Sequence, residues 1–336
     1  MTDTPRPDHP PTAPHALTRA FALGEVYDRH FLAHGLMNRN WRLDTASGPY
    51  AVKEITDVPL PEVRRNLAVL AGLADDGLPV PAPLATEGGD LVAEIDGHGY
   101  CVLAWVDGRH VPGPELTLDQ ARELGALLAR LHHALRRRSP GPLPDRCPPA
   151  EATRVGAADH AAGDLLVRLP AGATDGLDTA LRERRALLAR FADRRPRDVI
   201  PAGPYGWTHG DFQYRNLLRR DGGVVAILDW DRLGVRPYAE EVARTAQVQF
   251  GVDGVFDLDR VAAFTAGYRS VIELSETDLA DAVSRLWWKR LTDYWQLEFL
   301  LARRDPAFGK MFLEGEALLH WWTDRADEVQ AAYAAR

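Results

Sequence analysis

The sequence predicts an α+β protein with two lobes, a small β-rich lobe followed by a larger α-helical lobe. Short stretches of alternating polar and apolar residues, separated by glycine and proline turns, fill residues 21–106. Apolar residues then recur at helical spacing in most of the chain that follows. A length of 336 residues also exceeds what one small hydrophobic core organises, so two lobes are the default.

The chain divides into three expected segments. Residues 1–15 contain five prolines and few large apolar side chains, which predicts a disordered tail. We expect the β-rich lobe to span residues 16–104 and the helical lobe to span residues 105–336. The seam between them should lie near Ala104 and Gly108, where the strand signals end.

The first lobe has the signals of about five strands around one helix. A turn is expected at residues 47–49, and Asp96-Gly97 predicts a second turn between the last two strands. Pro61 suits the first turn of a helix, where its missing N–H has no partner to lose. The expected strands cover residues 26–33, 41–43, 50–55, 91–95 and 100–106, and the expected helix covers residues 62–73.

The second lobe opens with a capping box, because Thr117 precedes Gln120 by three residues. The leucines that follow it, up to Leu135, repeat on one helix face. Residues 139–150 form a proline-rich loop, and residues 177–194 predict another helix. Residues 207–229 predict a short strand, a loop and a hairpin, and the last hundred residues predict helices.

Composition excludes several classes of protein. With 46% hydrophobic and 26% charged residues, the chain is an ordinary globular one. A net charge of −8 argues against a nucleic-acid partner. Two cysteines make neither a disulfide framework nor a zinc site. Because no apolar run or leader-like start is visible, we expect a cytoplasmic protein without a membrane segment, and no obligate protein partner is evident.

Lysine is rare in this chain. Of 40 basic residues, only Lys53, Lys289 and Lys310 are lysines, and the rest are arginines. Any function that needs a compact ammonium group on a flexible stem therefore has only three candidates.

One segment carries the strongest chemical signal. Residues 207–216 read W-T-H-G-D-F-Q-Y-R-N, and residues 227–231 read I-L-D-W-D. Between them, Gly222-Gly223 predicts a hairpin with a two-residue loop. In that register Asn216 faces Asp229, and an amide oxygen beside a carboxylate suits Mg²⁺, which retains its waters and phosphate ligands. A shift of one residue would break this pairing.

Asp211 lies five residues before Asn216, on the loop that enters the hairpin. A carboxylate near a metal-bound phosphate can accept the proton of an attacking hydroxyl. The spacing H-x-D-x-x-x-x-N followed by a second aspartate is the arrangement found in kinases.

His209-Gly210-Asp211, Asn216 and the sequence L-D-W-D at residues 228–231 resemble the aminoglycoside phosphotransferase-like kinase superfamily, which has a protein-kinase-like fold. The resemblance covers roughly residues 20–245. It implies that Asp211 is the catalytic base and that Asn216 and Asp229 are magnesium ligands. His209 would orient the loop rather than transfer a proton.

The same resemblance implies a role for Lys53, on the expected strand at residues 50–55. It is similar to the family's third-strand lysine, which contacts the α- and β-phosphates. The family usually pairs that lysine with a helix glutamate, and this sequence departs from the pattern because Asn66 occupies that stretch. Either Glu62 substitutes, or Asn66 holds the lysine, or the pair is absent.

The nucleotide loop should lie in the turn at residues 34–40, where Asn38 and Asn40 resemble the G-x-x-N-x-N loop of some related kinases. Both asparagines also suit plain turns. The hinge that would read adenine fits Leu103-Ala104-Trp105-Val106, although Trp105 suits packing between lobes equally well. The resemblance thus places the nucleotide in the first lobe, and the catalytic loop, metal and acceptor in the second.

The predicted function is phosphotransfer from ATP or GTP, with Mg²⁺, to a hydroxyl of a small molecule. Aromatic and acidic residues on one expected helix could bind a cationic natural product, as in antibiotic resistance, or could simply form a core stripe. The candidate acceptor residues are Asp231, Trp288, Asp293, Trp295 and Glu298, and Asp231 could instead support another site residue or be a solvated loop acid. The alternatives are a metabolic kinase for homoserine, choline or a sugar, a protein Ser/Thr kinase, and a nucleotide-binding pseudokinase.

Overall fold

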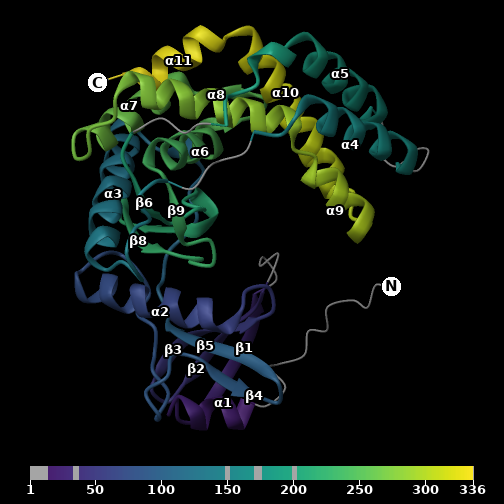
Figure 1. Ribbon diagram of the computed structural model, residues 1–336. Helices are drawn as coiled ribbons and strands as arrows, with labels where there is room; N and C mark the ends of the chain where they lie inside the picture. Colours follow the sequence, from purple (N-terminus) through teal and green to yellow (C-terminus); the bar gives the residue numbers. More distant parts are fainter. Residues whose placement is uncertain (1–13, 33–37, 148–151, 170–175, 199–202, 336) are drawn as a thin grey trace. The chain divides into compact units, whose positions relative to one another are not determined.

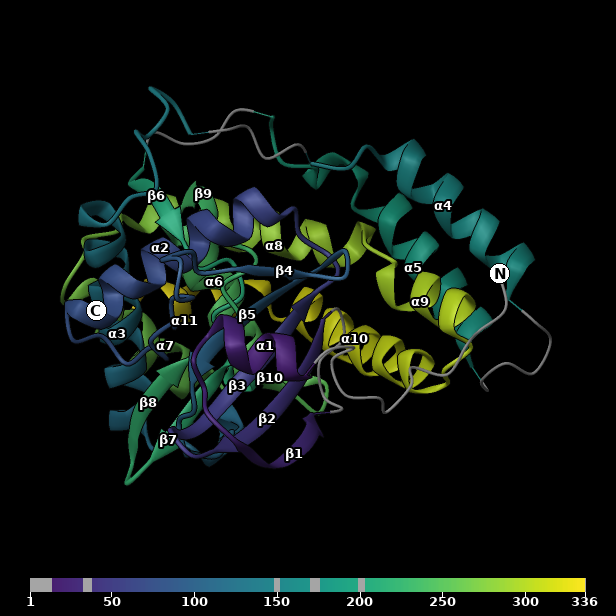
Figure 2. The same cartoon turned by 90° about the horizontal axis from the view of Figure 1, so that it is seen from below.

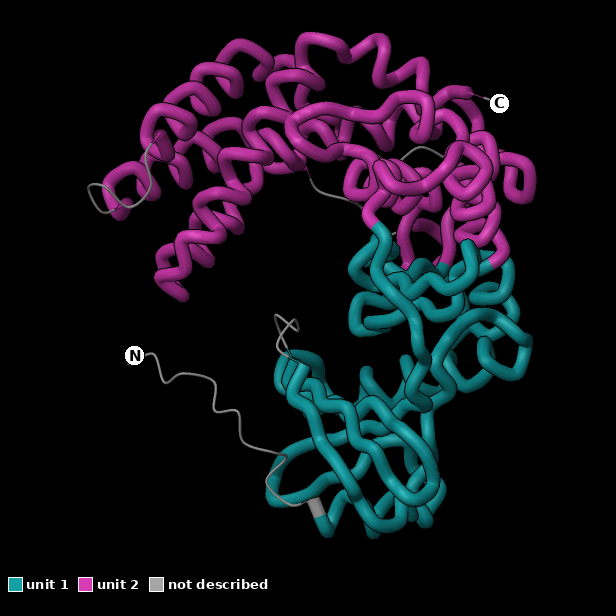
Figure 3. The backbone as a smooth tube through the Cα atoms, turned by 180° about the vertical axis from the view of Figure 1, so that it is seen from behind, with its two compact units in different colours: residues 1–111, 131–143, 207–234 teal, residues 112–130, 144–206, 235–336 magenta. Residues whose placement is uncertain are grey.

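The computed structural model describes residues 14–32, 38–147, 152–169, 176–198 and 203–335. The chain forms two compact units that are not continuous in sequence (Figure 3). Unit 1 contains residues 1–111, 131–143 and 207–234, and unit 2 contains residues 112–130, 144–206 and 235–336. The expected disordered tail lies outside the described residues, apart from Pro14 and His15 at the start of a short helix.

Unit 1 is built on a five-stranded antiparallel sheet with the strand order β1-β2-β3-β5-β4 (Figure 1). The strands are β1 (Val26–Leu32), β2 (Arg39–Thr45), β3 (Gly48–Ile55), β4 (Ala93–Ile95) and β5 (His98–Ala104). The sheet confirms the expected strands, since all five predicted stretches contain one. β3 lies between β2 and β5, so both of its edges are paired and its side chains have fixed directions.

Two helices accompany this sheet. Helix α1 (Pro14–Ala20) lies beside β4 (Figure 1) and contributes Leu17 to a core that includes Trp41 and Val102. Helix α2 (Leu60–Asp75) carries Pro61 in its first turn, as the sequence predicted. Its buried face includes Asn66, the one polar residue among its buried side chains.

The catalytic stretch belongs to unit 1 and begins with strand β6 (Tyr205–Thr208), whose first two residues fall in unit 2. A short 3₁₀ turn, Tyr214–Asn216, leads into β7 (Leu217–Arg220) and β8 (Gly223–Ile227), and strand β9 (Gly234–Pro237) follows. The predicted hairpin is therefore present.

The predicted register of that hairpin is wrong by one residue. The loop residues are Asp221 and Gly222, both with positive φ, and Gly223 already pairs with Arg220. Two left-handed residues give the turn that matches strand twist, and Asp-Gly is one of the pairs that suit it. An irregularity then shifts the pairing between Leu218 and Arg219, so Asn216 adjoins Leu228 and not Asp229, as the 2.8 Å bond from Leu228 N to Asn216 O shows.

Unit 2 is mostly helical. Helix α3 (Leu118–Arg137) begins in it behind the predicted capping box, in which Gln120 N donates to Thr117 Oγ1 and Thr117 N to Gln120 Oε1. Helices α4 and α5 lie side by side in both views (Figures 1 and 2). The remaining elements are α4 (Val155–Arg168), α5 (Leu177–Arg190), α6 (Tyr238–Phe250), β10 (Gly251–Val252), β11 (Val255–Phe256), α7 (Leu258–Arg269), α8 (Glu276–Thr292), α9 (Trp295–Arg303), α10 (Ala307–Asp324) and α11 (Ala326–Ala334).

The single helix expected to carry both Trp288 and Trp295 is in fact two helices. Helix α8 ends at Thr292 and α9 begins at Trp295. The Asp293 side chain accepts a bond from Trp295 N, which favours a new helix start over continuation. Within the described residues, no helix is both long and apolar enough to cross a membrane.

Candidate active site

His209 fixes the loop that leaves β6. Its side chain is fully buried, its Nε2 lies 2.9 Å from Leu228 O, and its Nδ1 accepts the Asp211 N–H at 3.2 Å. Because Nδ1 accepts, Nε2 carries the proton and donates to Leu228. Gly210 takes a φ of 82°, a left-handed turn that brings Asp211 back over the ring. These contacts give His209 the geometry of an orienting residue.

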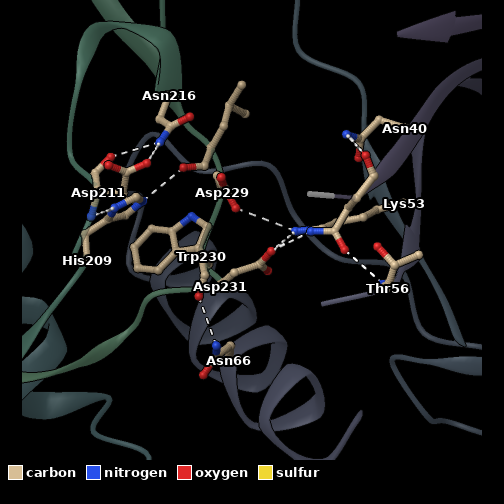
Figure 4. A network of polar contacts seen from close by, with 12 residues as sticks. Asn40, Lys53, Thr56, Asn66, His209, Asp211, Asn216, Asp229, Trp230 and Asp231 are labelled. Atoms are coloured by element: carbon tan, nitrogen blue, oxygen red, sulfur yellow. Dashed lines mark hydrogen bonds and ion pairs between the residues drawn. The ribbon is translucent and has the colours of Figure 1, made fainter. Parts of the chain in front are cut away.

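The Asp211 carboxylate is held by amide groups. Its Oδ2 accepts from Asn216 Nδ2 at 2.8 Å and from Gln213 Nε2 at 3.2 Å. Asn216 Nδ2 also donates to the backbone oxygen of Asp211 at 2.9 Å. The amide nitrogen of Asn216 thus faces Asp211, and its carbonyl oxygen points the other way (Figure 4). This arrangement fixes the direction of the Asp211 carboxylate, which is expected to accept a proton. It also fixes the direction of the Asn216 carbonyl oxygen, which is expected to bind a metal ion.

Asp229 follows β8 in a left-handed conformation, with a φ of 60°. This conformation is costly for a residue with a Cβ and is typical of functional sites. Its Oδ1 lies 3.6 Å from Lys53 Nζ. Burial raises the pKa of Asp229, the charges of Asp231 and Asp211 act in the same direction, and Lys53 opposes them. A cation beside this carboxylate would therefore be favoured.

Asn216 and Asp229 fit a magnesium ion in donor chemistry. Both offer hard oxygen atoms, and Mg²⁺ is commonly held by one or two protein side chains together with substrate phosphates. The bond between Leu228 N and Asn216 O keeps Asp229 one residue from Asn216 across the hairpin, even though the predicted direct pairing is wrong.

Lys53 lies in the central strand β3 and points into this cluster (Figure 4). Its Nζ lies 2.6 Å from Asp231 Oδ2. Burial acts most strongly on the pKa of Lys53 and lowers it, but the charges of Asp231 and Asp229 outweigh burial, so the pKa is raised. The lysine is therefore a permanent cation at neutral pH.

Asn38 of the expected nucleotide loop reaches the same cluster. Asn38 Nδ2 donates to Asp231 Oδ2 at 2.8 Å, and Asn38 Oδ1 accepts from Thr56 N at 3.0 Å. Asn40 Nδ2 lies 3.5 Å from the backbone oxygen of Asn38. Part of the loop, residues 34–37, lies outside the described residues.

The structure answers the question of which residue holds Lys53. Glu62 is exposed, and Asn66 is buried and donates to Trp230 O at 2.9 Å. The partners of the lysine are Asp231 and, at longer range, Asp229. Sequence reasoning gave Asp231 as a possible acceptor contact or supporting residue and did not name Lys53 as its partner. The clue was the absent helix glutamate, which left the lysine without a carboxylate partner.

The expected hinge, Leu103 to Val106, runs from the end of β5 into the following loop. Ala104 N donates to Ala82 O at 2.8 Å. The Trp105 indole donates to Asp107 Oδ1 at 2.9 Å, and the guanidinium of Arg42 lies 4.8 Å from its ring centroid. Trp105 is thus packed inside unit 1 by local contacts, and its role toward adenine stays a prediction.

The other candidate acceptor residues belong to unit 2. Trp288 is buried and donates to Thr153 O at 2.9 Å, so it is part of the core. Asp293 Oδ1 accepts a bond from Trp295 N at the start of α9, and the ring centroids of Trp295 and Phe299 lie 5.7 Å apart. Glu298, also on α9, is exposed. The role of these four residues in acceptor binding stays a prediction.

The fold and the site together define a protein-kinase-like phosphotransferase. The sequence model of the phosphotransferase enzyme family matches residues 28–274, and this chain belongs to that family. It is therefore a kinase in the broad sense of an enzyme that transfers a phosphoryl group, and the resemblance seen in its motifs is confirmed.

Relatives of known activity extend over most of the chain. A homoserine kinase of Methylobacillus glycogenes is 26% identical over 324 residues, which cover 91% of this chain and 95% of that protein. A homoserine kinase of Phenylobacterium zucineum is 28% identical over 267 residues, covering 77% and 76%.

Solved structures confirm the fold. A spectinomycin phosphotransferase solved with ADP and spectinomycin has a TM-score of 0.64 at 16% identity, covering 95% of this chain and 96% of that one. An aminoglycoside phosphotransferase of Alicyclobacillus acidocaldarius has a TM-score of 0.61 at 18% identity, covering 97% and 96%. An amicoumacin kinase solved with AMP-PNP and Ca²⁺ has a TM-score of 0.59 at 16% identity, covering 90% and 92%.

Proposed function

We propose that this chain transfers the γ-phosphoryl group of ATP to the hydroxyl of homoserine or a closely similar small amino alcohol. The observation that carries the phosphotransfer is the gathering of Asp211, Asn216, Asp229 and Lys53 in one compact unit. The choice of homoserine is supported by relatives of that activity, which match three quarters or more of the chain.

Each residue of the site has one task in this mechanism. Phosphoryl transfer passes through a loose transition state, so the protein mainly positions groups and balances charge. Asp211 accepts the proton of the acceptor hydroxyl, and Asn216 keeps its carboxylate turned toward that position. Lys53 neutralises phosphates that are not transferred. Asn216 and Asp229 would hold Mg²⁺, which supplies positive charge to the phosphate oxygens when bound.

Homoserine takes precedence over the aminoglycoside-like acceptor expected from the sequence. The antibiotic kinases among the solved structures share only 16–18% identity, so their likeness concerns the fold and not the acceptor. The acidic residues Asp293 and Glu298 would suit the ammonium group of either acceptor. A role in antibiotic resistance therefore has no support beyond the fold.

The decisive experiment is a screen for ATP consumption with single acceptors. Homoserine, choline, simple sugars, aminoglycosides and a peptide substrate are tested in parallel, with mass spectrometry of each product. We expect homoserine to gain one phosphoryl group. A phosphorylated aminoglycoside or peptide with unchanged homoserine would contradict the proposed acceptor but retain the kinase.

Nucleotide and metal binding are tested separately by thermal denaturation. We expect Mg²⁺ with ATP to raise the melting temperature of the wild type, and this metal-dependent rise to vanish in Asp229→Ala. Parallel titration with GTP decides which nucleotide is preferred. No metal-dependent shift with either nucleotide in the wild type would count against the whole phosphotransfer scheme.

A further inference from the structure

One carboxylate oxygen joins two residues of the expected nucleotide site. Asp231 Oδ2 lies 2.6 Å from Lys53 Nζ and accepts from Asn38 Nδ2 at 2.8 Å. The side chains of Lys53 and Asp231 are only 17% and 20% exposed, so water competes weakly for these bonds. Lys53 comes from β3 and Asn38 from the loop before β2, and both reach Asp231 in the loop that follows Asp229. Figure 4 shows Lys53 pointing at Asp231.

The loop that carries Asp231 is itself held by helix α2. Asn66 Nδ2 donates to the backbone oxygen of Trp230, and Arg65 donates to the other end of the Asn66 amide. The Trp230 indole donates back to Ile227 O at 2.9 Å, which ties the loop to the end of β8. Trp230 is buried, so its neighbour Asp231 has little freedom to move.

We propose that Asp231 is the positioning residue of Lys53 in this enzyme and that it takes over the task of the absent helix glutamate. Asn66, on the helix, then positions the loop and not the lysine. The inference rests on the proposed phosphotransfer, because it names the residue that holds Lys53, the cation of that reaction, in place.

The alternatives within unit 1 fit the geometry less well. Glu62 is exposed on α2, and the 3.6 Å separation of Asp229 from Lys53 is longer than a hydrogen bond. An ammonium group on a four-carbon stem needs a fixed partner to hold one position. Asp231 provides that partner, and through Asn38 it also links the lysine to the nucleotide loop.

The first test observes the lysine directly in the nucleotide-free protein. With ¹⁵N-labelled lysine, the chain gives only three side-chain ammonium signals, and loss of one signal in Lys53→Arg identifies Lys53. We expect that signal to shift in Asp231→Asn and to stay in place in the matched control Glu62→Gln. A shift in Glu62→Gln with none in Asp231→Asn would overturn the assignment.

The second test separates positioning from metal or acceptor binding. We expect Asp231→Asn to lower kcat/KM for ATP about tenfold or more, since it loses a charge-assisted bond. The Mg²⁺ concentration for half-maximal activity and the KM for the acceptor should stay unchanged. Asp231→Glu, which keeps the carboxylate, should recover part of the loss, and Glu62→Gln should match the wild type.

Other outcomes contradict the proposal. A higher Mg²⁺ requirement in Asp231→Asn would make Asp231 a metal ligand, and a higher acceptor KM alone would make it an acceptor contact. Unchanged kinetics would overturn the positioning role even if the lysine signal moves. A wild type that consumes no ATP would instead remove the proposed function, while the lysine signals would still decide which carboxylate holds Lys53.

Discussion

The Asp211 carboxylate meets the geometric needs of a general base. Asn216 and Gln213 both donate to its Oδ2, and His209 holds its backbone N–H, so the side chain has one preferred direction. General bases of this kind contribute about 10²- to 10⁴-fold to the rate. We predict that Asp211→Asn, which keeps the shape, lowers kcat by that range, measured as initial rates of ATP consumption.

A second aspartate in the same hairpin provides the control. Asp221 sits in the turn with a φ of 52°, a conformation that asparagine tolerates well. Asp221→Asn should therefore retain the wild-type kcat and melting temperature. If Asp211→Asn were as active as Asp221→Asn, Asp211 would not be the base.

The raised pKa of Asp229 gives a prediction about stability and pH. The folded protein retains a proton on Asp229 at pH values above 3.8, the ordinary pKa, where the unfolded chain has already lost it. As pH rises from the ordinary pKa to the raised one, Asp229 therefore lowers the free energy of unfolding. Asp229→Asn removes the titration. In metal-free buffer, the melting temperature of this variant relative to the wild type should increase as pH rises above 3.8 and then level off.

Asp90 should show the opposite sign. Burial raises the pKa of Asp90, but the N–H of Val92 and the guanidinium of Arg64 outweigh burial and lower it. Its ionised form therefore stabilises the fold, and that contribution is lost as pH falls through the depressed pKa. Asp90→Asn should lose stability at neutral pH and approach the wild type in acid. If the stability of both variants relative to the wild type changed with pH in the same direction, the raised pKa of Asp229 would be contradicted.

At the scale of elements, the hairpin of β7 and β8 shows which part of a turn a sequence predicts. Asp221-Gly222-Gly223 predicted the hairpin, but both Asp-Gly and Gly-Gly suit a two-residue loop, so the motif alone does not say which pair forms it. The irregularity near Leu218 depends on packing that no local motif records. The closeness of Asn216 to Asp229 was thus predicted from the sequence, and the register of the hairpin was not.

Two neighbouring glycines test that register. Gly222 has a φ of 84°, whereas Gly223 has no positive φ, and a methyl group there would have ordinary space, with Arg220 O at 3.9 Å. Gly222→Ala should cost about 1 kcal/mol or more of unfolding free energy, and Gly223→Ala should stay within about 0.5 kcal/mol of the wild type. Urea denaturation measures both. Equal losses would favour a loop centred on both glycines.

The break between α8 and α9 is a second feature that the sequence pattern did not predict. Trp288, Leu291 and Trp295 keep helical spacing, so the pattern predicted one helix. The extended backbone of Asp293 ends α8, and the bond from Trp295 N to the Asp293 side chain accompanies the new start. Periodicity finds apolar faces, but it does not find a two-residue interruption.

At the scale of the whole molecule, motifs predicted the residues of the site better than their connections. Lys53 and Asp231 are 178 positions apart in sequence, and both lie in unit 1, whereas the sequence led us to expect the strand in the first lobe and the hairpin in the second. The carboxylate that faces Lys53 lies in a loop held by Asn66, the residue at which the sequence departs from the family's usual glutamate. Long-range polar partners of this kind have no local pattern.

The scarcity of lysine across the molecule leads to a last prediction. Lys53 is enclosed by Asp231, Asp229 and the paired strands, while Lys310 is 80% exposed beside Glu314 and Lys289 is also exposed. A planar guanidinium at position 53 would not place a single point charge between the two carboxylates. Lys53→Arg should lower kcat/KM for ATP about 10- to 100-fold, the range of a lost charged hydrogen bond.

The other two lysines supply the matched controls for this change. Lys289→Arg and Lys310→Arg keep the charge at exposed positions, where substitutions rarely alter stability by more than about 0.5 kcal/mol. Both should retain wild-type kcat/KM, measured in the same ATP-consumption assay. If Lys53→Arg also retained it, any cation would serve at that position, and a need for ammonium geometry would not explain why this arginine-rich chain has a lysine in β3.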